Sequence, residues 1–559
     1  MSRTHSSPSF RSPLKKSRSR HFTTALAAVA SLSLALSACS TPSTGGDGES
    51  SDKSTKQFVV LENMELGNYN PLLGHGRNGE SHIYDSLYRV SPGKNSKPKP
   101  VLADGEAKSN DDLTEWTVPL KKDISFSDGS SFGPEDVVAT YKAIIDPRFA
   151  STEATAVESI DDVTPDGDHA VKFHLKHPDS EFDRRIYRAI APSEAFDFTN
   201  PAKAEDMKIN SDPIGTGPYK VTSLRPDEAI LEARDGYWGD APETEKIVIR
   251  HNTDDNTRAQ QMRVGEGDGT MLEAKLADTV AKSKDISAEH IDSLDWRGIS
   301  LPAAHPVAGD DAIRMAMNLS VDRQKMIDDI YAGHGTPTST FITDAYGDAY
   351  DKDSEIPHDT KKAEKILDDA GWVKESDGIR VKDGQREEMD VIYFPNRDAA
   401  RKDLTLAAAS DLKAIGIQIN PVAKDSSAVT EEVYNSTPVM LGGGGEPYTI
   451  DGQIYHILHS KYAADGVGAK WDNASDYVNP EIDKLLDQAR SESNKDKRNK
   501  IYKKVQQEYR KKPAMLALTY GAHSYVLNSH GMKTGDQIVE PHSHGSLFGP
   551  WYNIEEWHN

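Results

Sequence analysis

The chain has 559 residues, a formal net charge of −23 and a single cysteine. An acidic chain does not offer the clustered Lys and Arg that phosphate contacts need, so nucleic-acid binding is not expected. One cysteine excludes an intramolecular disulfide and a zinc site built from several thiolates. The length indicates about three domain-sized units.

The first 38 residues have the three regions of a secretory signal peptide. Residues 1–21 carry six basic and no acidic residues, and residues 22–36 are mostly Ala, Leu and Val. A basic region, an apolar region and small residues before the cut are typical of export. The apolar run is too short for a membrane span, which needs about 20 residues. Leu36-Ser37-Ala38-Cys39 resembles a bacterial lipobox, so we predict that Cys39 is lipidated and becomes the mature N-terminus.

Residues 39–56 are rich in Ser, Thr and Gly. Such a segment cannot bury apolar area and is predicted to be a flexible tether with a reach on the order of 20 Å. A lipid on Cys39 would hold the body near the extracytoplasmic face of the cell membrane. This arrangement favours a protein that captures something and passes it to a membrane partner.

The early part of the body is predicted to be rich in strands. Residues 58–61 form a short apolar run typical of a buried strand. Residues 116–120 and 171–175 alternate apolar and polar side chains, which predicts strands with one covered face, and residues 247–249 predict another strand. Gly133-Pro134-Glu135-Asp136 indicates a helix start.

Beyond about residue 305 the pattern becomes helical. Apolar residues spaced by three and four predict helices over residues 312–330, 361–370, 404–415, 482–489 and 501–509. Gly371 and Gly416 are helix-ending signals, and residues 417–419 predict a strand directly after Gly416. This alternation of helix and strand is typical of an α/β lobe. Residues 515–520 are interpreted as a strand that returns to the early part of the fold.

Four segments of the body carry a more specific pattern. Residues 113–141 read LTEWTVPLKKDISFSDGSSFGPEDVVATY, with Lys121 where Arg is usual, and three further segments cover residues 213–219, 234–239 and 313–323. Together they resemble the extracytoplasmic solute-binding proteins, family 5, of peptide/nickel/opine ABC importers. Gly267 departs from the pattern, because an apolar residue usually stands there.

The resemblance implies an α/β fold of the periplasmic-binding-protein type, in which two lobes close on a ligand like a hinge. An extra subdomain is inserted in the first lobe. We expect lobe I to comprise residues 57–91, 205–300 and 520–559, the inserted subdomain residues 92–204, and lobe II residues 301–519.

The resemblance also implies function. We expect a monomeric binding protein, not an enzyme, whose partners are the transmembrane permease subunits and cytoplasmic ATPases of an importer. A secreted hydrolase is a distant alternative, because neither G-x-S-x-G nor HExxH occurs in the sequence.

Arg185-Ile186-Tyr187-Arg188 is the first segment that bears on the ligand. Nickel-binding members have two arginines with this spacing, and the first of them holds a carboxylate of the organic chelator. Arg185 would take this role, because a guanidinium forms a rigid fork that matches a carboxylate. A solvated basic surface is the alternative interpretation. Arg188, Arg77 and Arg148 are further candidate ligand-binding residues.

Residues 442–448, Gly-Gly-Gly-Gly-Glu-Pro-Tyr, are the second such segment. Peptide-binding members usually have Trp-x-x-Asp here, and the Asp binds the amino terminus of the peptide. Pro447 stands at the place of that Asp, with Glu446 beside it, whereas nickel-type members resemble this chain in having Pro-Tyr. Tyr448 is therefore a candidate pocket residue, and the glycines would let the backbone approach a ligand or form a mobile loop.

Two ligand hypotheses follow. The favoured one is a metal–chelator complex, such as nickel with a small organic acid, held by Arg185, Tyr448 and a histidine, with His459 and His456 as candidate metal ligands. His542-Ser543-His544 is another possible pair. The alternative is a short peptide with Glu446 in place of the missing Asp. No cofactor is expected beyond such a transported complex.

Overall fold

The computed structural model describes residues 57–74, 80–91, 97–395, 399–443, 448–463, 472–542 and 548–559. The predicted signal peptide, Cys39 and the tether lie outside these residues. Within the described part of the chain, no helix combines the length and the apolar character that a membrane crossing requires.

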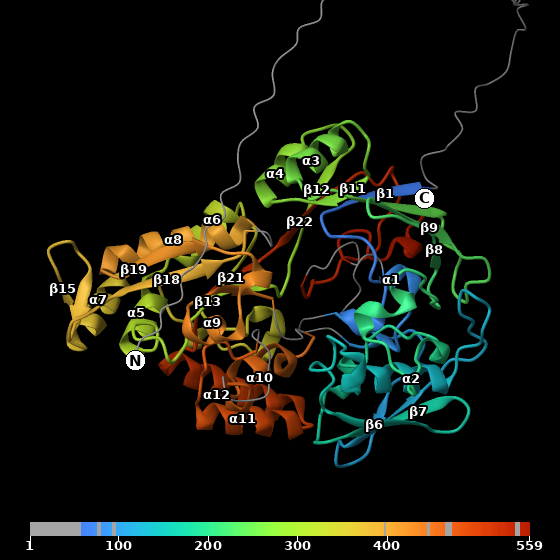
Figure 1. Ribbon diagram of the computed structural model, residues 1–559, viewed down its shortest axis with the longest axis horizontal. Helices are drawn as coiled ribbons and strands as arrows, with labels where there is room; N and C mark the ends of the chain where they lie inside the picture. Colours follow the sequence, from blue (N-terminus) through green and yellow to red (C-terminus); the bar gives the residue numbers. More distant parts are fainter. Residues whose placement is uncertain are drawn as a thin grey trace, which may run out of the picture. The chain divides into compact units, whose positions relative to one another are not determined.

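A seven-stranded mixed sheet is the first structural unit (Figure 1). Its central strand β1 pairs in parallel with β10 and β11, and the outer pairs are antiparallel. In spatial order the strands are β12 (Ser287–Ile291), β22 (His523–Leu527), β11 (Gly269–Met271), β1 (Gln57–Glu62), β10 (Lys246–His251), β9 (Glu228–Ala233) and β8 (Tyr219–Leu224).

Strand β1 is buried on both faces, as predicted for residues 58–61. Its successive side chains point to opposite faces. Val59 and Leu61 pack in a core with helices α3 (Asp255–Arg263) and α4 (Ala274–Val280), whereas Phe58 and Val60 join the largest core of this half. Leu61 also explains the unusual Gly267, because a Cβ atom there would lie 2.6 Å from the Leu61 side chain.

A separate antiparallel sheet lies in the segment expected to be the inserted subdomain. Its order is β4 (Lys108–Ser109), β5 (Glu115–Pro119), β7 (Ala170–Leu175) and β6 (Ile160–Pro165). Alternate residues of β5 and β7 are buried, as their pattern predicts. Helix α2 (Pro134–Ile145) begins where predicted, and the Asp136 carboxylate accepts a hydrogen bond from the Gly133 amide at 2.8 Å.

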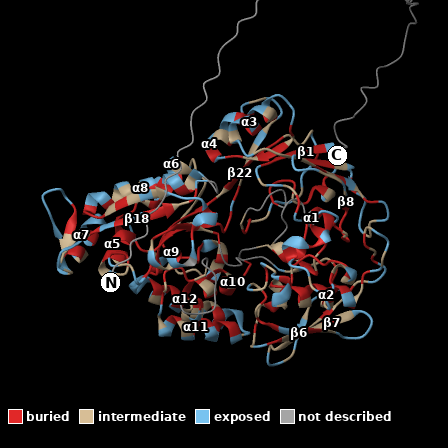
Figure 2. Cartoon of the chain, viewed as in Figure 1, coloured by how far each residue is buried: buried red, intermediate tan, exposed pale blue. Residues whose placement is uncertain are grey.

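The second half of the fold is built around an antiparallel sheet of β14 (Gly335–Pro337), β21 (Met515–Gly521), β13 (Trp296–Ser300) and β20 (Met440–Gly442). The parallel pair β18 (Glu388–Tyr393) and β19 (Gln418–Ala423) lies beside it, joined by helix α8 (Ala399–Ile415). The other helices are α5 (Asp311–Ser320), α6 (Arg323–Ile330), α7 (Thr360–Asp369), α10 (Ile450–Leu458), α11 (Pro480–Ser491) and α12 (Lys495–Lys511). Buried residues follow the sheets and the inner helix faces (Figure 2).

The predicted helices of this half are confirmed, with one break. The helix expected over residues 312–330 is two helices, because Val321 leaves the helical conformation and Asp322 caps α6. Gly371 and Gly416 have φ angles of 85° and 96°, as their helix-ending role requires. The short elements are α1 (Glu80–Ile83), β2 (Tyr88–Arg89), β3 (Lys99–Pro100), β15 (Val373–Lys374), β16 (Arg380–Lys382), β17 (Gln385–Arg386) and α9 (Glu431–Ser436).

Two short segments of the described chain link the large sheets. Residues 292–295 connect β12 to β13, and Ala522 connects β21 to β22. The strand predicted over residues 515–520 exists, but its expected return to the early part is wrong, because β21 pairs with β13 and only β22 rejoins the first sheet. The lobe boundaries stay a prediction; β13, which ends at Ser300, pairs in the second sheet.

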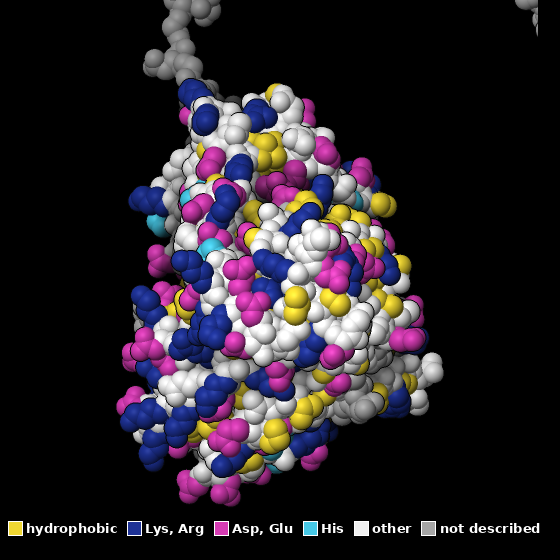
Figure 3. Space-filling model, turned by 90° about the vertical axis from the view of Figure 1, so that its left-hand side faces the viewer, with side chains coloured by type: hydrophobic (Ala, Val, Ile, Leu, Met, Phe, Trp, Pro, Cys, Tyr) yellow, Lys and Arg dark blue, Asp and Glu magenta, His cyan; other side chains and the backbone are white. Residues whose placement is uncertain are grey.

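Charged side chains of both signs are interspersed on the face that carries α7 and α8 (Figure 3). The most exposed large hydrophobic side chains of the described residues belong to different elements: Val264, Val373, Leu406 and Val478. This surface has the character of a solvated exterior.

Candidate functional site

A cavity of about 110 Å³ lies between the segment after α1, the loop after β7 and the residues that precede α10. Such a volume holds several water molecules. Its wall contains Tyr448, whose neighbour helix α10 packs in the core of the second half, although Tyr448 itself belongs to the core of the first half. The cavity therefore combines residues from both halves of the fold.

Aromatic side chains form much of the cavity wall. The rings of Tyr187 and Tyr448 have centroids 4.3 Å apart and are tilted by 58°. Rings at such separations attract each other and give a ligand a rigid apolar surface. The aromatic lining residues are Tyr84, Tyr88, Tyr187, Tyr448, Phe548 and Tyr552.

One charged pair of the wall joins Arg188 and Glu153, both buried. Arg188 donates from Nη2 and Nε to Glu153 Oε2 at 2.9 and 3.1 Å, and from Nη1 to the carbonyl of Arg185 at 2.9 Å. The guanidinium also lies 4.2 Å from the ring centre of Tyr187. These contacts fix the guanidinium plane at the wall of the cavity.

Asp85 and Arg89 supply a second acid and a second base to the wall. The Asp85 carboxyl accepts hydrogen bonds from Trp238 Nε1 at 3.0 Å and Thr216 Oγ1 at 3.1 Å. Burial raises the pKa of Asp85, against the opposing effects of Trp238 and Arg89. Arg89 pairs with Glu555 at 3.1 Å and its side chain is 30 % exposed. A cationic group near Asp85 would favour its charged form.

Arg185, the predicted chelator clamp, does not line this cavity. Its Nε donates to Asp179 Oδ2 at 2.6 Å and its Nη2 to Asp451 Oδ2 at 2.5 Å, all in a buried setting. Arg490 binds the same Asp451 at 3.0 Å. Two protein carboxylates thus hold the guanidinium that was predicted to bind a carboxylate of the ligand.

The two candidate metal histidines are held by acidic neighbours. Nδ1 of His456 lies 3.4 Å from Asp472, and Nε2 of His459 lies 3.4 Å from Asp487. Burial alone would lower the pKa of His456, but its hydrogen bonds to Asp472 and Glu158 raise it. Among the described residues, neither histidine belongs to a group of three ligand atoms close enough for one ion.

The remaining predicted residues are dispersed. Arg148 is exposed, pairs with Asp146 at 2.6 Å and does not line the cavity. His542 lies 2.8 Å from Asp295, and its proposed companion His544 falls outside the described residues. Arg77 and Glu446 also lie outside the described residues. Of the predicted ligand-binding residues, Arg188 and Tyr448 are those that the structure places in the cavity wall.

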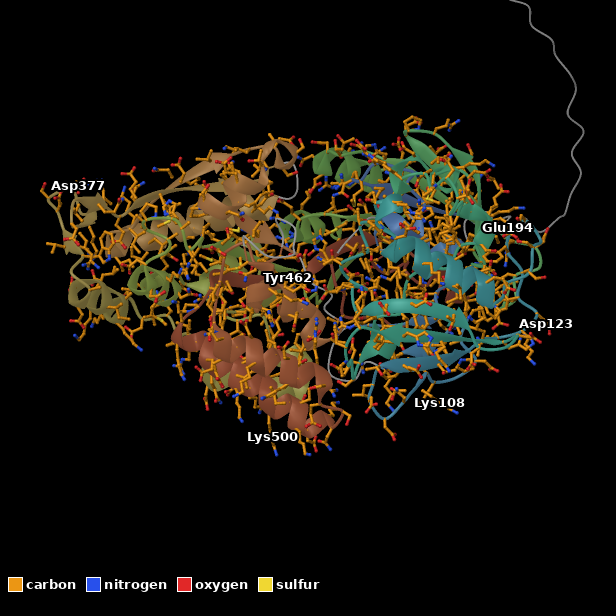
Figure 4. The ribbon with its side chains drawn as sticks, turned by 60° about the horizontal axis from the view of Figure 1, so that its bottom comes forward. Lys108, Asp123, Glu194, Asp377, Tyr462 and Lys500 are labelled. Carbon is orange, nitrogen blue, oxygen red and sulfur yellow. The ribbon has the colours of Figure 1, made fainter. Side chains whose placement is uncertain are left out.

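Glu158, which lies just before β6, is the centre of a polar cluster. The other members come from α10 and from the residues that follow it. Tyr462 donates a hydrogen bond to Glu158, and Lys461 Nζ lies 3.1 Å from the same carboxylate. Burial would raise the pKa of Glu158, but hydrogen bonds from His456 and Tyr462 lower it. Figure 4 places Tyr462 where the ribbons of the two halves meet, whereas Asp377 and Asp123 lie at opposite ends.

Sequence reasoning missed Asp85, Arg89 and Glu153. The segment Tyr84-Asp85-Ser86-Leu87-Tyr88-Arg89 interleaves aromatic and charged residues, which was a usable signal. Glu153 had no local signal, because its importance depends on Arg188, 35 positions later.

Comparisons with known proteins identify the family. The model of the bacterial extracellular solute-binding proteins, family 5 Middle, matches residues 97–464. The chain belongs to this family. Its members are the binding components of ABC importers, not enzymes, and act outside the cytoplasm.

Individual relatives agree with this family. Protein XP55 of Streptomyces lividans is 34% identical over 519 residues, which cover 91% of each chain. The oligopeptide-binding protein AppA of Bacillus subtilis is 25% identical over 459 residues, which cover 79% of this chain and 80% of AppA. The crystal structure of NikZ from Campylobacter jejuni in complex with Ni(L-His) superposes with a TM-score of 0.78 at 22% identity, covering 90% of this chain and 100% of NikZ. The two-lobed α/β fold predicted from the sequence is thereby confirmed.

Proposed function

We propose that this protein captures short peptides with free termini for an ABC importer and is held at the membrane by a lipid on Cys39. It would act as a monomer and deliver the ligand to transmembrane permease subunits that cytoplasmic ATPases drive. The lobes would be those expected from the sequence, with β13 assigned to lobe II because of its sheet partners.

The charge pattern of the cavity carries this proposal. Two guanidinium groups, Arg89 and Arg188, and two carboxyl groups, Asp85 and Glu153, lie in a wall that is otherwise rich in aromatic rings. A ligand with one ammonium and one carboxylate complements such a wall. Its ammonium would add to the hydrogen bonds that Asp85 accepts, and its carboxylate would join Glu555 at the partly exposed guanidinium of Arg89. Aromatic surfaces beside the charges suit the side chains and peptide planes between the two termini.

The metal–chelator hypothesis has less support. No imidazole lines the cavity among the described residues, and the Arg185 guanidinium already binds Asp179 and Asp451. The similarity to AppA, an oligopeptide-binding protein, favours a peptide. Glu446, two positions before the lining residue Tyr448, stays a candidate partner for the amino terminus.

Calorimetry of the full-length protein in mild detergent tests the proposal. We expect saturable binding of di- to pentapeptides and at least a tenfold loss of affinity when the same peptide is N-acetylated or C-amidated. Arg89→Gln should weaken binding, whereas Arg148→Gln, an exposed arginine outside the cavity wall, serves as the matched control. Binding of Ni²⁺ with histidine without any binding of peptides would overturn the proposal.

A further inference from the structure

Asp278, His290 and His334 form a cluster on elements of the fold that do not line the cavity. Asp278 lies on α4, His290 on β12, and His334 in the turn between α6 and β14. One potential ligand atom from each residue lies within 4.8 Å of the other two. Among the described residues, these three are the one set of His, Cys, Asp or Glu side chains close enough to share a metal ion. None of them lines the cavity.

His334, the member of the cluster that belongs to the second half of the fold, is positioned by a tight turn. Ala332 and Gly333 have φ angles of 55° and 87°, and this left-handed turn after α6 carries the chain to His334. The carbonyl of His334 accepts a hydrogen bond from Ala522, the residue that links the two large sheets. The imidazole of His334 then stacks on that of His290, with ring centroids 3.5 Å apart and planes 8° apart.

His290, on strand β12 of the first sheet, is held by the buried hydroxyl of Ser524. His290 Nδ1 lies 2.8 Å from Ser524 Oγ on the neighbouring strand β22, and Ser524 is buried. This contact turns Nε2 toward Asp278 Oδ1 at 3.1 Å. The His290 side chain is 14 % exposed and that of Asp278 46 % exposed, so solvent reaches the carboxylate end of the cluster.

We propose that Asp278, His290 and His334 bind a divalent transition-metal cation of the Zn²⁺, Ni²⁺ or Cu²⁺ class. Two imidazole nitrogens and one carboxylate oxygen are ligands that these ions accept, and three protein ligands leave a coordination position for water. Metal-bound histidines commonly have their second ring nitrogen held by a protein group, as Ser524 holds His290 here. Because Ser524 and Asp278 hold the His290 ring, the His334 ring is the one that must turn out of the stack for its nitrogen to reach the same ion.

The position of the site gives it a structural consequence. His334 belongs to the turn before β14 of the second sheet, whereas Asp278 and His290 belong to the elements of the first sheet. A bound ion would therefore join the two halves beside the Ala522 link. This site is independent of the proposed peptide function, and its occupation would not require a ligand in the cavity.

Calorimetric titration with ZnCl₂ tests the site. The full-length protein is prepared without a histidine tag for this measurement. We expect one Zn²⁺ per chain, and at least a tenfold loss of affinity in His334→Gln and in His290→Gln. Ser524→Ala should weaken binding by about tenfold through loss of ring orientation. Peptide affinity should not change in His334→Gln, which separates this proposal from the proposed function.

His174→Gln is the matched control. His174 also lies between a hydroxyl, Thr164 Oγ1 at 3.2 Å, and a carboxylate, Glu115 Oε1 at 3.2 Å, but it belongs to no three-residue group among the described residues. Electron paramagnetic resonance with Cu²⁺ as the probe should report two coordinating nitrogens in the wild type and one in His334→Gln. The absence of stoichiometric binding, or equal binding in wild type and His334→Gln, would overturn the proposal even if His290→Gln fails to fold.

Discussion

The guanidinium of Arg185 lies 2.5 Å from the carboxylate of Asp451, 266 positions away in the sequence. This contact joins the loop after β7 to helix α10, and both side chains are buried. Arg490 of α11 binds the same carboxylate at 3.0 Å. One carboxylate thus compensates two guanidinium groups where the two halves of the fold meet.

Asp451→Asn removes this compensation and should be strongly destabilising. Burial alone would raise the pKa of Asp451, but Arg490 and Arg185 lower it, so the group is charged at neutral pH. The change leaves Arg490 without its partner at 3.0 Å, whereas Arg185 keeps Asp179. Breaking a buried ion pair on one side costs about 3–5 kcal/mol. Urea unfolding at pH 7 measures the loss.

Asp369→Asn is the control for this change. Asp369 pairs with Lys365 at 2.7 Å on α7, but its side chain is 65 % exposed, so its removal should cost no more than about 0.5 kcal/mol. Equal unfolding midpoints for the two variants would contradict the role assigned to Asp451.

A second cluster of buried charged residues lies at the β21–β22 link. We expect it to make the free energy of unfolding fall as the pH becomes alkaline. His523 Nδ1 lies 2.5 Å from Glu540 and Nε2 lies 3.3 Å from Asp295. His542 and Arg297 also contact the Asp295 carboxylate. Burial alone would lower the pKa of His523, but hydrogen bonds to Asp295 and Glu540 raise it from 6.5 to about 9.

Because the folded pKa of His523 exceeds the unfolded value, its contribution is fully present below about pH 6.5 and is lost as the pH rises through about 9. We expect the free energy of unfolding to fall by about 2–3 kcal/mol over this window. His523→Gln should be less stable at pH 7 and should show a flatter dependence between pH 7 and 9. An unchanged slope, compared with the variant of the half-buried His174, His174→Gln, would count against this assignment.

Local signals in the sequence predicted local structure well, whereas the site depended on distant partners. The start of α2 was predicted from Pro134 and the acidic residues that follow it, and the structure adds a hydrogen bond between Gly133 and Asp136 within the same turn. Gly371 ends α7 for an equally local reason. Arg185 and Arg188 look equivalent in the sequence, but Asp179 and Asp451 hold the first, and Glu153 holds the second at the cavity wall. No spacing within residues 185–188 encodes that difference.

Tyr448→Ala should weaken peptide binding by about tenfold, whereas Tyr448→Phe should bind nearly as the wild type does. The expected loss follows from the ring, which packs 4.3 Å from Tyr187 and lines the cavity just before helix α10. Aromatic contacts of this kind contribute about 0.5–1.5 kcal/mol beyond the area they bury. Calorimetry with the tightest-binding peptide measures both variants, and full affinity in Tyr448→Ala would exclude this wall as the binding surface.

Gly217→Ala should destabilise the fold by about 3 kcal/mol or more, because the motif at residues 213–219 packs backbone against backbone. A Cβ atom at Gly217 would lie 2.6 Å from the carbonyl carbon of Ile83 and 2.9 Å from the carbonyl oxygen of His82. The Gly217 amide donates to the Ile83 carbonyl at 2.9 Å, so neither segment can move away without losing that bond.

Gly236→Ala is the control. Gly236 has a φ of 73° and open space around its Cβ position, so only the conformational cost of about 1–2 kcal/mol applies. Thermal unfolding of both variants decides the matter, since a Gly217→Ala midpoint at or above that of Gly236→Ala would show that the approach at Ile83 is looser than the structure has it.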